Sequence, residues 1–441
     1  MTLWPFQGVL FPQAAFLFVS WVPMTKRKLQ NLLIITPYFW PETFRINEVA
    51  PMVAREGVAI TVLTGQPNYP EGRVYGGFRA LGGGLDHTPL GVDVARVPVI
   101  PRGKGSGFRL LISYISFLIS CCVVGPFLLR RRKFDAILYY GVSPILLATT
   151  GLWFRSLKKA PLALWVQDLW PGSLEAVGYR LDPLLTRILE FAVGLIYRGS
   201  DLILVASKGF EIDIRRICGR NTLCVYHPNP AENEVINKAA ARRVARDGMF
   251  EVLFAGNLGR ACGLETILEA AHQLRRAPSI KFRLIGGGSR RSWLKQEISR
   301  LGLTNITIEN RVPPHAMPAI LSRASALLVT LTRSPTMALS FPSKTSTYMA
   351  SGTPLIVSAD GETARIVEEA GAGLCVAAQD ATALVAAIKR LQSMPEYERA
   401  AMGEAGKAYS LRAFEPSRLA SALIEHLQGA MERYSLNRGT Q

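Results

Sequence analysis

The sequence has few of the residues from which metal centres and disulfide-stapled folds are built. Its 441 residues include 6 cysteines and 5 histidines, and no CxxC, HExxH or Asp-x-Asp occurs anywhere in the chain. These absences argue against a zinc ribbon, a disulfide scaffold and a carboxylate pair that would clamp a metal-bound nucleotide. We therefore expect a protein of a reducing compartment that uses no cofactor and no tightly bound metal.

Apolar and basic residues, by contrast, are abundant. Hydrophobic residues make up 49% of the chain and charged residues 19%, which excludes a disordered protein, and 441 residues are too many for one core. The 51 Lys and Arg residues outnumber the 33 Asp and Glu residues, for a net charge of +18. This excess suits an anionic partner, which by charge alone is a phospholipid, a phosphorylated substrate or a nucleic acid.

Short apolar runs recur along the chain, and longer segments of helical character follow them. In the first half they occupy 32–36, 59–64, 136–140, 163–167, 202–206 and 223–226. In the second half they occupy 252–255, 281–285, 306–309, 326–331, 354–358 and 374–377. Such runs are typical of parallel strands that are buried on both faces. Two consecutive sets predict an α/β protein with two Rossmann-like, doubly wound domains that face each other across a cleft.

Two prolines, Pro228 and Pro230, make a stiff turn between the two sets of runs. We expect an N-terminal domain over 25–229, a C-terminal domain over 230–412, and a terminal helix and tail over 413–441. Residues 1–24 carry no charged side chain and lack the basic start of a signal peptide, so we interpret them as an extension upstream of a start at Met24.

One segment bears on membrane contact. Residues 110–129 are uncharged and are followed directly by the basic run 130–133. Twenty residues are long enough to span a bilayer, but strand–helix units continue on both sides of the segment. We favour a helix that is partly in the core and partly dips into a membrane, so that 108–133 contact the membrane surface. The alternative is a wholly buried crossover helix with a solvated basic end.

Loops that follow the strands of the first half offer polar groups to a ligand. Thr43 and Arg45 stand where a helix begins after the first run, and Asn68 and Tyr69 stand in the loop after the second. No GxGxxG occurs there, and the first loop can equally be a packed aromatic turn. Asp168, at the end of the fourth run, is either a helix cap or hydrogen-bond anchor, or a cleft residue that handles an acceptor hydroxyl.

Two glycine turns with basic residues follow the first two runs of the second half. Glycine at a strand-to-helix turn lets backbone N–H groups approach an anion, and two such turns in one domain point to a diphosphate. The residues concerned are Gly256, Asn257, Gly259, Arg260, Gly286, Gly288 and Arg291.

Lys344 precedes a helix later in the same domain. A lysine there would stabilise a departing phosphate oxygen without a metal. The alternative is an ordinary exposed lysine near a helix start.

At this point the residues carry a resemblance to a known family. The segments concerned are PYFWPETFRINEVA, TGQPNYPEG, VQDLWPGSLEAVG, FAGNLGRACGLETILEAA, IGGGSRR, RVPPHAMPAIL and PSKTSTYMASGTPLIVS, which span about residues 31 to 380. The chain resembles the family 4 retaining glycosyltransferases of the GT-B fold, in the group that builds colanic acid, capsule and O-antigen.

The resemblance implies transfer of a hexosyl residue from a nucleotide-sugar bound to the C-terminal domain. The acceptor, bound to the N-terminal domain, would be a polyprenyl-diphosphate-linked saccharide in exopolysaccharide biosynthesis. The enzyme would be cytoplasmic, peripheral or monotopic at the cytoplasmic face of the inner membrane, without a nucleic-acid partner. The implied residues are Lys344, Arg260 and Asp168 for catalysis; Gly256, Asn257, Gly259, Gly286, Gly288, Arg291, Arg311, Val312, Ser340, Pro342, Ser343, Thr345 and Thr347 for the donor; and Thr43, Arg45, Asn68 and Tyr69 for the acceptor.

The sequence also departs from the family pattern. Many members carry two glutamates eight residues apart, but Thr347 occupies the second position here and no acid covers the first. Asn257 and Cys262 replace the usual phosphate-binding Arg and Lys. We interpret this as a rearranged donor site that uses Arg260, Lys344 and backbone amides; an inactive or partner-dependent subunit is the alternative.

Two further readings remain open at this stage. A nucleotide-sugar epimerase of the same fold predicts a cleft rich in acids and histidines. A non-catalytic membrane- or nucleic-acid-binding protein predicts aromatic residues interleaved with Lys and Arg on an exposed surface.

Overall fold

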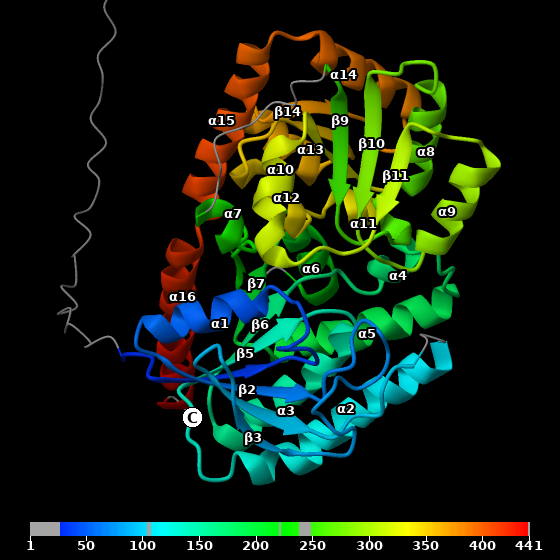
Figure 1. Cartoon of the computed structure of the whole chain (residues 1–441). Helices are drawn as coiled ribbons and strands as arrows, with labels where there is room; N and C mark the ends of the chain where they lie inside the picture. Colours follow the sequence, from blue (N-terminus) through cyan, green and yellow to red (C-terminus); the bar gives the residue numbers. More distant parts are fainter. Residues whose placement is uncertain (1–26, 104–106, 220–221, 238–247, 440–441) are drawn as a thin grey trace, which may run out of the picture.

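The computed structural model describes residues 27–103, 107–219, 222–237 and 248–439, and the extension expected at 1–24 lies outside them. Two sheets, each covered by helices on both faces, form two domains that lie one above the other in Figure 1. The predicted α/β fold with two Rossmann-like domains is thereby confirmed.

The N-terminal sheet has eight strands in the order β3-β4-β2-β1-β5-β6-β7-β8. Its first strand lies near the centre, where Leu32 pairs with Ile60 on one side and with Ala136 on the other. All pairs are parallel except β3 with β4 at the edge. The strands are β1 (Asn31–Ile35), β2 (Ala59–Gly65), β3 (Gly84–His87), β4 (Asp93–Val97), β5 (Ala136–Gly141), β6 (Leu162–Val166), β7 (Leu202–Val205) and β8 (Cys224–Tyr226).

All six apolar runs of the first half are strands, but the sequence did not predict β3 and β4. In β4 the apolar pattern is interrupted by Arg96, whose side chain is only 2% exposed. Its guanidinium donates to the backbone oxygens of Trp40 at 2.6 Å and Gly65 at 3.3 Å, and pairs with Asp86 at 3.2 Å. These partners satisfy the buried charge and join the loop that follows β1 to the end of β2.

Helices cover both faces of this sheet. One face carries α2, α3, α5 and α6; the other carries α1 and α16 (Pro416–Gly439), which returns from the C-terminal end to pack on α1 (Figure 1). The remaining helices of the domain are α1 (Ile46–Arg55), α2 (Gly107–Leu128), α3 (Thr149–Lys158), the short α4 (Gly172–Ala176), α5 (Pro183–Gly199) and α6 (Phe210–Cys218).

The helix α2 is not a wholly buried crossover helix, which corrects that alternative. Its buried residues, Ser113, Phe117, Cys121 and Gly125, form one stripe at a spacing of four, and the opposite side is apolar and exposed. Its length and mean hydropathy, 2.1 over the best 18-residue window, would suffice to cross a membrane, and 22% of that window is buried.

The C-terminal sheet has six parallel strands in the order β11-β10-β9-β12-β13-β14. Every apolar run of the second half is one of these strands. They are β9 (Phe250–Ala255), β10 (Ile280–Ile285), β11 (Ile306–Glu309), β12 (Ala326–Thr330), β13 (Leu355–Ser358) and β14 (Gly373–Val376). The strand order reverses direction at β9, and ligands of such sheets bind beyond the carboxyl ends of the strands at this switch point.

The helices around this sheet complete the domain. They are α7 (Asn233–Asn237), α8 (Leu264–Gln273), α9 (Arg291–Arg300), α10 (Met317–Arg323), α11 (Pro335–Ala338), α12 (Ser343–Ala350), α13 (Glu362–Glu369), α14 (Ala381–Ser393) and α15 (Glu396–Ala413). The short helices α4 and α11 pack against each other across the two domains.

Candidate functional site

A groove between the two domains has a cavity volume of about 1000 Å³. From the N-terminal domain, Thr43 and Arg45 line it; from the C-terminal domain, Val312 and Ser343 do. The structure therefore brings expected acceptor residues and expected donor residues to opposite walls of one groove.

The two glycine turns of the C-terminal domain touch each other. A Cβ atom on Gly286 would lie 1.9 Å from the backbone oxygen of Gly256, and φ is +151° at Gly286 and +149° at Gly256. The N–H of Gly256 donates to the oxygen of Ile285 at 2.9 Å. Only glycine combines this contact with this backbone conformation, so the carboxyl ends of β9 and β10 are held together by glycine.

The rest of both turns is equally close-packed. A Cβ on Gly288 would lie 2.6 Å from Oδ1 of Asn257, and one on Gly259 would lie 2.8 Å from Nδ2 of the same side chain. Asn257 is exposed, so its amide lies at the surface of the turn. A large side chain is therefore excluded from the place where a ligand would approach the backbone.

Lys344, in the first turn of α12, lies beside these turns. Its ammonium group sits 3.8 Å from the centroid of the Phe254 ring, and its Cδ would be 3.7 Å from a Cβ on Gly256. The Nζ atom is buried and has no hydrogen-bond partner among the described residues. Burial lowers the pKa of Lys344, because an unpaired ammonium is poorly solvated there. Lys344 is therefore not the ordinary exposed lysine of the alternative interpretation.

Three arginines surround the turns at different places. Arg260 reaches across the interface, where its Nη1 would be 3.0 Å from a Cβ on Gly178 of the N-terminal domain. The Nε of Arg311 would lie 3.1 Å from a Cβ on Gly287, and Arg291 donates to Oδ1 of Asn310 at 2.7 Å. Arg260 and Arg311 thus border the turns, whereas Arg291 already has a partner.

The segment around the start of α12 is held mainly by its own hydrogen bonds. Pro342 is the N-cap residue of α12, and the hydroxyl of Ser340 donates to the oxygen of Thr336 at 2.8 Å. Thr345 is 0% exposed and Thr347 is 3% exposed. The sequence placed both threonines at the donor, but the structure buries them inside α12.

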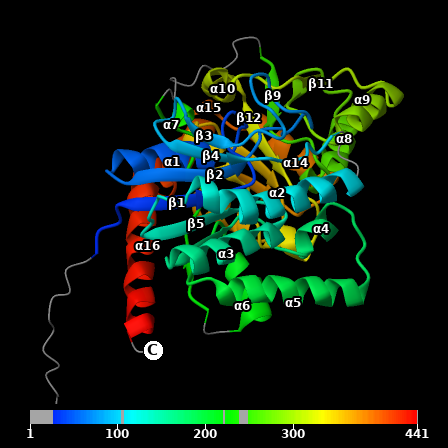
Figure 2. The ribbon, with the colours of Figure 1, turned by 90° about the horizontal axis from the view of Figure 1, so that it is seen from below.

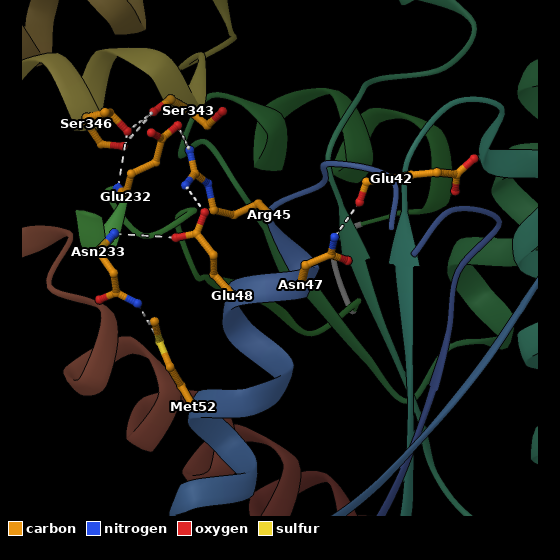
Figure 3. Close-up of polar contacts among 10 residues, drawn as sticks. Glu42, Arg45, Asn47, Glu48, Met52, Glu232, Asn233, Ser343 and Ser346 are labelled. Carbon is orange, nitrogen blue, oxygen red and sulfur yellow. Dashed lines mark hydrogen bonds and ion pairs between the residues drawn. The ribbon is translucent and has the colours of Figure 1, made fainter. Parts of the chain in front are cut away.

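A charged cluster of Arg45, Glu48 and Glu232, shown in Figure 3, was not expected from the sequence. Arg45 forms ion pairs with Glu48 at 2.8 Å and with Glu232 at 3.1 Å. The backbone N–H of Glu232 in turn donates to Oγ1 of Thr347 at 3.3 Å. Arg45 therefore links the N-terminal domain to the start of the C-terminal domain. Glu232 also brings a carboxylate to the groove, close to Thr347, which occupies the position of the second glutamate of the family pattern.

Glu42 is a second residue that the sequence argument did not select. It is 1% exposed, and it accepts backbone N–H bonds from Phe39 at 3.2 Å, Asn68 at 2.7 Å and Tyr69 at 2.6 Å. Burial raises the pKa of Glu42 to about 7, although the three N–H donors oppose the shift. Glu42 thereby fixes the loop after β2 to the loop after β1.

Asn68 and Tyr69 consequently have defined positions. The side chain of Asn68 is buried, donates to the oxygen of Gln66 at 2.9 Å and accepts the N–H of Arg102 at 3.2 Å. The ring of Tyr69 packs against the rings of Tyr38 and Phe44, with centroids 5.4 and 5.2 Å away. The first loop is thus a packed aromatic turn, and its outer residues still line the groove.

Asp168 lies at the carboxyl end of β6 and is anchored by a neighbouring loop. The hydroxyl of Ser143 donates to its Oδ2 at 2.9 Å, and the indole N–H of Trp170 donates to that hydroxyl at 3.0 Å. Burial raises the pKa of Asp168. Among the described residues, no three His, Cys, Asp or Glu side chains are grouped closely enough to hold a metal ion.

Solved structures share the arrangement of two facing domains. Sucrose-phosphate synthase from Thermosynechococcus elongatus aligns with a TM-score of 0.72 at 18% identity, over 93% of this chain and 100% of that one. Anabaena HepE, solved in complex with UDP and glucose, aligns with a TM-score of 0.64 at 16% identity, over 90% of this chain and 98% of that one. The architecture is that of the GT-B glycosyltransferases.

Sequence comparisons identify the family. The glycosyl transferase 4-like domain model matches residues 43–230, and the model of glycosyl transferases group 1 matches residues 236–409. A putative colanic acid biosynthesis glycosyl transferase, WcaI of Escherichia coli K12, is 24% identical over 401 residues, which cover 87% of this chain and 95% of that protein. The chain belongs to the family 4 glycosyltransferases of the GT-B fold, as the sequence motifs predict.

Proposed function

We propose that the protein is a retaining, metal-independent hexosyltransferase that uses a nucleotide-sugar donor and a lipid-linked saccharide acceptor. The observation that carries this proposal is the buried ammonium of Lys344, which lies beside the turns at Gly256 and Gly286 and has no hydrogen-bond partner among the described residues. An unpaired buried cation is costly, and the diphosphate of a nucleotide-sugar would supply the missing negative charge.

The proposed reaction breaks the bond between the sugar carbon and the diphosphate oxygen. The acceptor hydroxyl forms its new bond on the same face of the sugar, and its proton passes to the departing phosphate oxygen. Lys344 and backbone N–H groups of the two turns stabilise the charge that develops on that oxygen, while Arg260 closes the interface beside them. Asp168 orients the acceptor hydroxyl and is not required to remove its proton.

The outer face of the N-terminal domain supports a lipid-linked acceptor. Helices α2, α3 and α5 pack side by side (Figure 2). Apolar side chains of all three helices are exposed. These side chains are 45–73% exposed: Phe108, Leu111, Ile115, Ile119, Val123, Phe127, Trp153, Leu157, Leu184, Leu185, Ile188, Phe191 and Leu195. With the basic run 130–133 at one end, this face suits monotopic contact with the cytoplasmic face of the inner membrane.

A donor screen tests the proposal. Purified enzyme is incubated with a panel of UDP- and GDP-sugars, with and without a prenyl-diphosphate saccharide, and the released nucleotide and sugar products are identified. We expect hydrolysis or transfer with one donor, and a fall of at least about a hundredfold in Lys344→Ala, the scale for losing one transition-state donor.

Lys389, an exposed lysine of the same domain, provides the matched control, and Lys389→Ala should retain full activity. An epimerised nucleotide-sugar as the only product would instead indicate an epimerase. Equal rates in both variants would remove Lys344 from the mechanism.

A further inference from the structure

Two backbone segments of the N-terminal domain cross next to the start of α2. The N–H of Gly103 donates to the oxygen of Gly72 at 2.9 Å, and a Cβ on Gly72 would lie 1.6 Å from the oxygen of Gly103. The crossing therefore joins the loop after β2, which holds Asn68 and Tyr69, directly to the segment that leads into α2.

Two arginines converge on this crossing. The guanidinium of Arg102 lies over the ring of Tyr69 at 4.9 Å from its centroid, and its backbone N–H donates to Asn68. The Nη1 of Arg109 would lie 3.3 Å from a Cβ on Gly103. Neither guanidinium has a carboxylate at ion-pairing distance in the part of the chain that the structure describes.

The arginines lie between the apolar surface of α2 and the loop that holds Tyr69. On one side, Phe108 and Leu111 begin the exposed stripe of α2 and are 73% and 54% exposed. On the other side, the hydroxyl of Tyr75 donates to the oxygen of Tyr69 at 2.8 Å. The apolar stripe of α2, the arginine pair and the loop that holds Tyr69 and Tyr75 therefore adjoin one another in this order.

We propose that Arg102 and Arg109 bind the diphosphate of the lipid-linked acceptor, with the prenyl chain along the outer face of α2 and the saccharide toward Tyr69. This rests on the proposed function and adds the place where the acceptor is held. The order of chemical groups in such a lipid, namely chain, diphosphate and sugar, matches the order of surfaces along the molecule. Two guanidinium groups present paired N–H donors that suit phosphate oxygens.

A binding experiment tests the arginine pair without requiring turnover. Farnesyl diphosphate, farnesyl monophosphate and farnesol are titrated in detergent against the wild type, Arg102→Gln, Arg109→Gln and the double variant. We expect farnesyl diphosphate to bind at least tenfold more tightly than farnesol. Each single substitution should weaken diphosphate binding about tenfold and the double about a hundredfold, the range for hydrogen bonds to charged groups.

Three controls keep the result specific. Arg276→Gln, at an exposed arginine of the C-terminal domain, should bind as the wild type does. Arg102→Lys, which keeps the charge, should lose less than Arg102→Gln, and thermal unfolding should show that all variants are folded. UDP affinity, measured on the same samples, should be unchanged, so that failure of the donor site is detected separately.

Two outcomes would overturn the inference. The first is that the wild type binds farnesyl diphosphate and farnesol with equal affinity, or that the double variant binds farnesyl diphosphate as tightly as the wild type does. The other is a fall in binding to phosphatidylcholine vesicles containing phosphatidylglycerol that is as large as the fall for farnesyl diphosphate. That second result would assign the arginines to bilayer headgroups.

Discussion

The two domains differ in how far the polar groups near their interface are already paired; we call these two sets of groups the N-terminal wall and the C-terminal wall. On the N-terminal wall, Glu42 accepts three N–H bonds, and Arg45 has two carboxylate partners. On the C-terminal wall, the ammonium of Lys344 is buried beside the two glycine turns and has no hydrogen-bond partner among the described residues.

This difference separates two tasks. Paired groups hold loops in place before any ligand arrives, whereas an unpaired buried cation gains most of its stabilisation from a ligand of opposite charge. Under the proposed function, the N-terminal wall would position the acceptor, and the C-terminal wall would bind the charge that moves during the reaction. The following experiments test each side of that contrast.

The largest effect is expected on the N-terminal wall, in the free energy of unfolding. The pKa of Glu42 is raised from 4.5 to about 7, so the folded state holds this proton more tightly than the unfolded state. Stability should therefore fall as pH rises from about 4.5 to 7, by up to about 3 kcal/mol from this residue. Glu42→Gln lacks this titration, and denaturant unfolding of both proteins at pH 5, 6, 7 and 8 measures the difference.

The same pair of proteins supplies its own control. UDP affinity should be equal in wild type and Glu42→Gln, because Glu42 belongs to the opposite wall. Parallel stability profiles over this pH range would show that Glu42 is not the buried, titrating group described above.

On the C-terminal wall, Gly286→Ala should weaken donor binding about a hundredfold. Its Cβ would meet the oxygen of Gly256 at 1.9 Å in a backbone conformation that alanine disfavours, so the turn must move and its charge-assisted hydrogen bonds to the diphosphate are lost. Gly429→Ala, which meets only the flexible side chain of Arg433 at 3.5 Å, is the matched control. Unchanged nucleotide affinity in Gly286→Ala would contradict the diphosphate site.

The pH dependence of donor binding should follow Lys344. Its pKa is lowered by burial, so the ammonium loses its proton at a pH below its ordinary value of 10.5. Nucleotide affinity should be constant below that lowered pKa and fall by up to about tenfold per pH unit above it. Lys344→Met should be weaker throughout and lack this step in a titration from pH 6 to 10. A step of the same size in both proteins would assign the titration to another group.

The smallest effect is expected from Asp168→Asn. Asparagine has the shape of aspartate and keeps an oxygen that can accept the hydrogen bond from the hydroxyl of Ser143. In the proposed reaction the departing phosphate, and not Asp168, takes the proton of the acceptor hydroxyl. We expect kcat to fall by about tenfold or less, with donor affinity unchanged. Since loss of a general base typically costs about a hundredfold to ten-thousandfold, a thousandfold loss in steady-state kinetics would make Asp168 the base.

Most of the fold could be predicted because buried parallel strands are continuous apolar runs. The sequence did not predict the strands β3 and β4, because β3 is short and exposed and because Arg96 interrupts the apolar run of β4. Arg96 donates to the backbone oxygen of Trp40, 56 residues away in the chain, and to that of Gly65, 31 residues away. A local sequence pattern does not predict such distant partners.

The site was predictable in its local parts only. Each glycine turn and its cations can be recognised in the sequence, because the glycines and the basic residues of one turn lie within a few residues of each other. The contact between Gly256 and Gly286, and the pairing of Arg45 with Glu232 across 187 residues, depend on how the strands and domains come together. For the same reason, Glu42 and Glu232 were missed, and the buried threonines at 345 and 347 were placed at the donor.

Calorimetric titration of UDP and GDP into the wild type, Lys344→Ala and Lys389→Ala tests most directly whether the C-terminal wall is a diphosphate site. The account predicts binding of one nucleotide to the wild type and to Lys389→Ala, and an affinity at least tenfold weaker in Lys344→Ala. Equal affinity in all three proteins, or no nucleotide binding to the wild type, would contradict it.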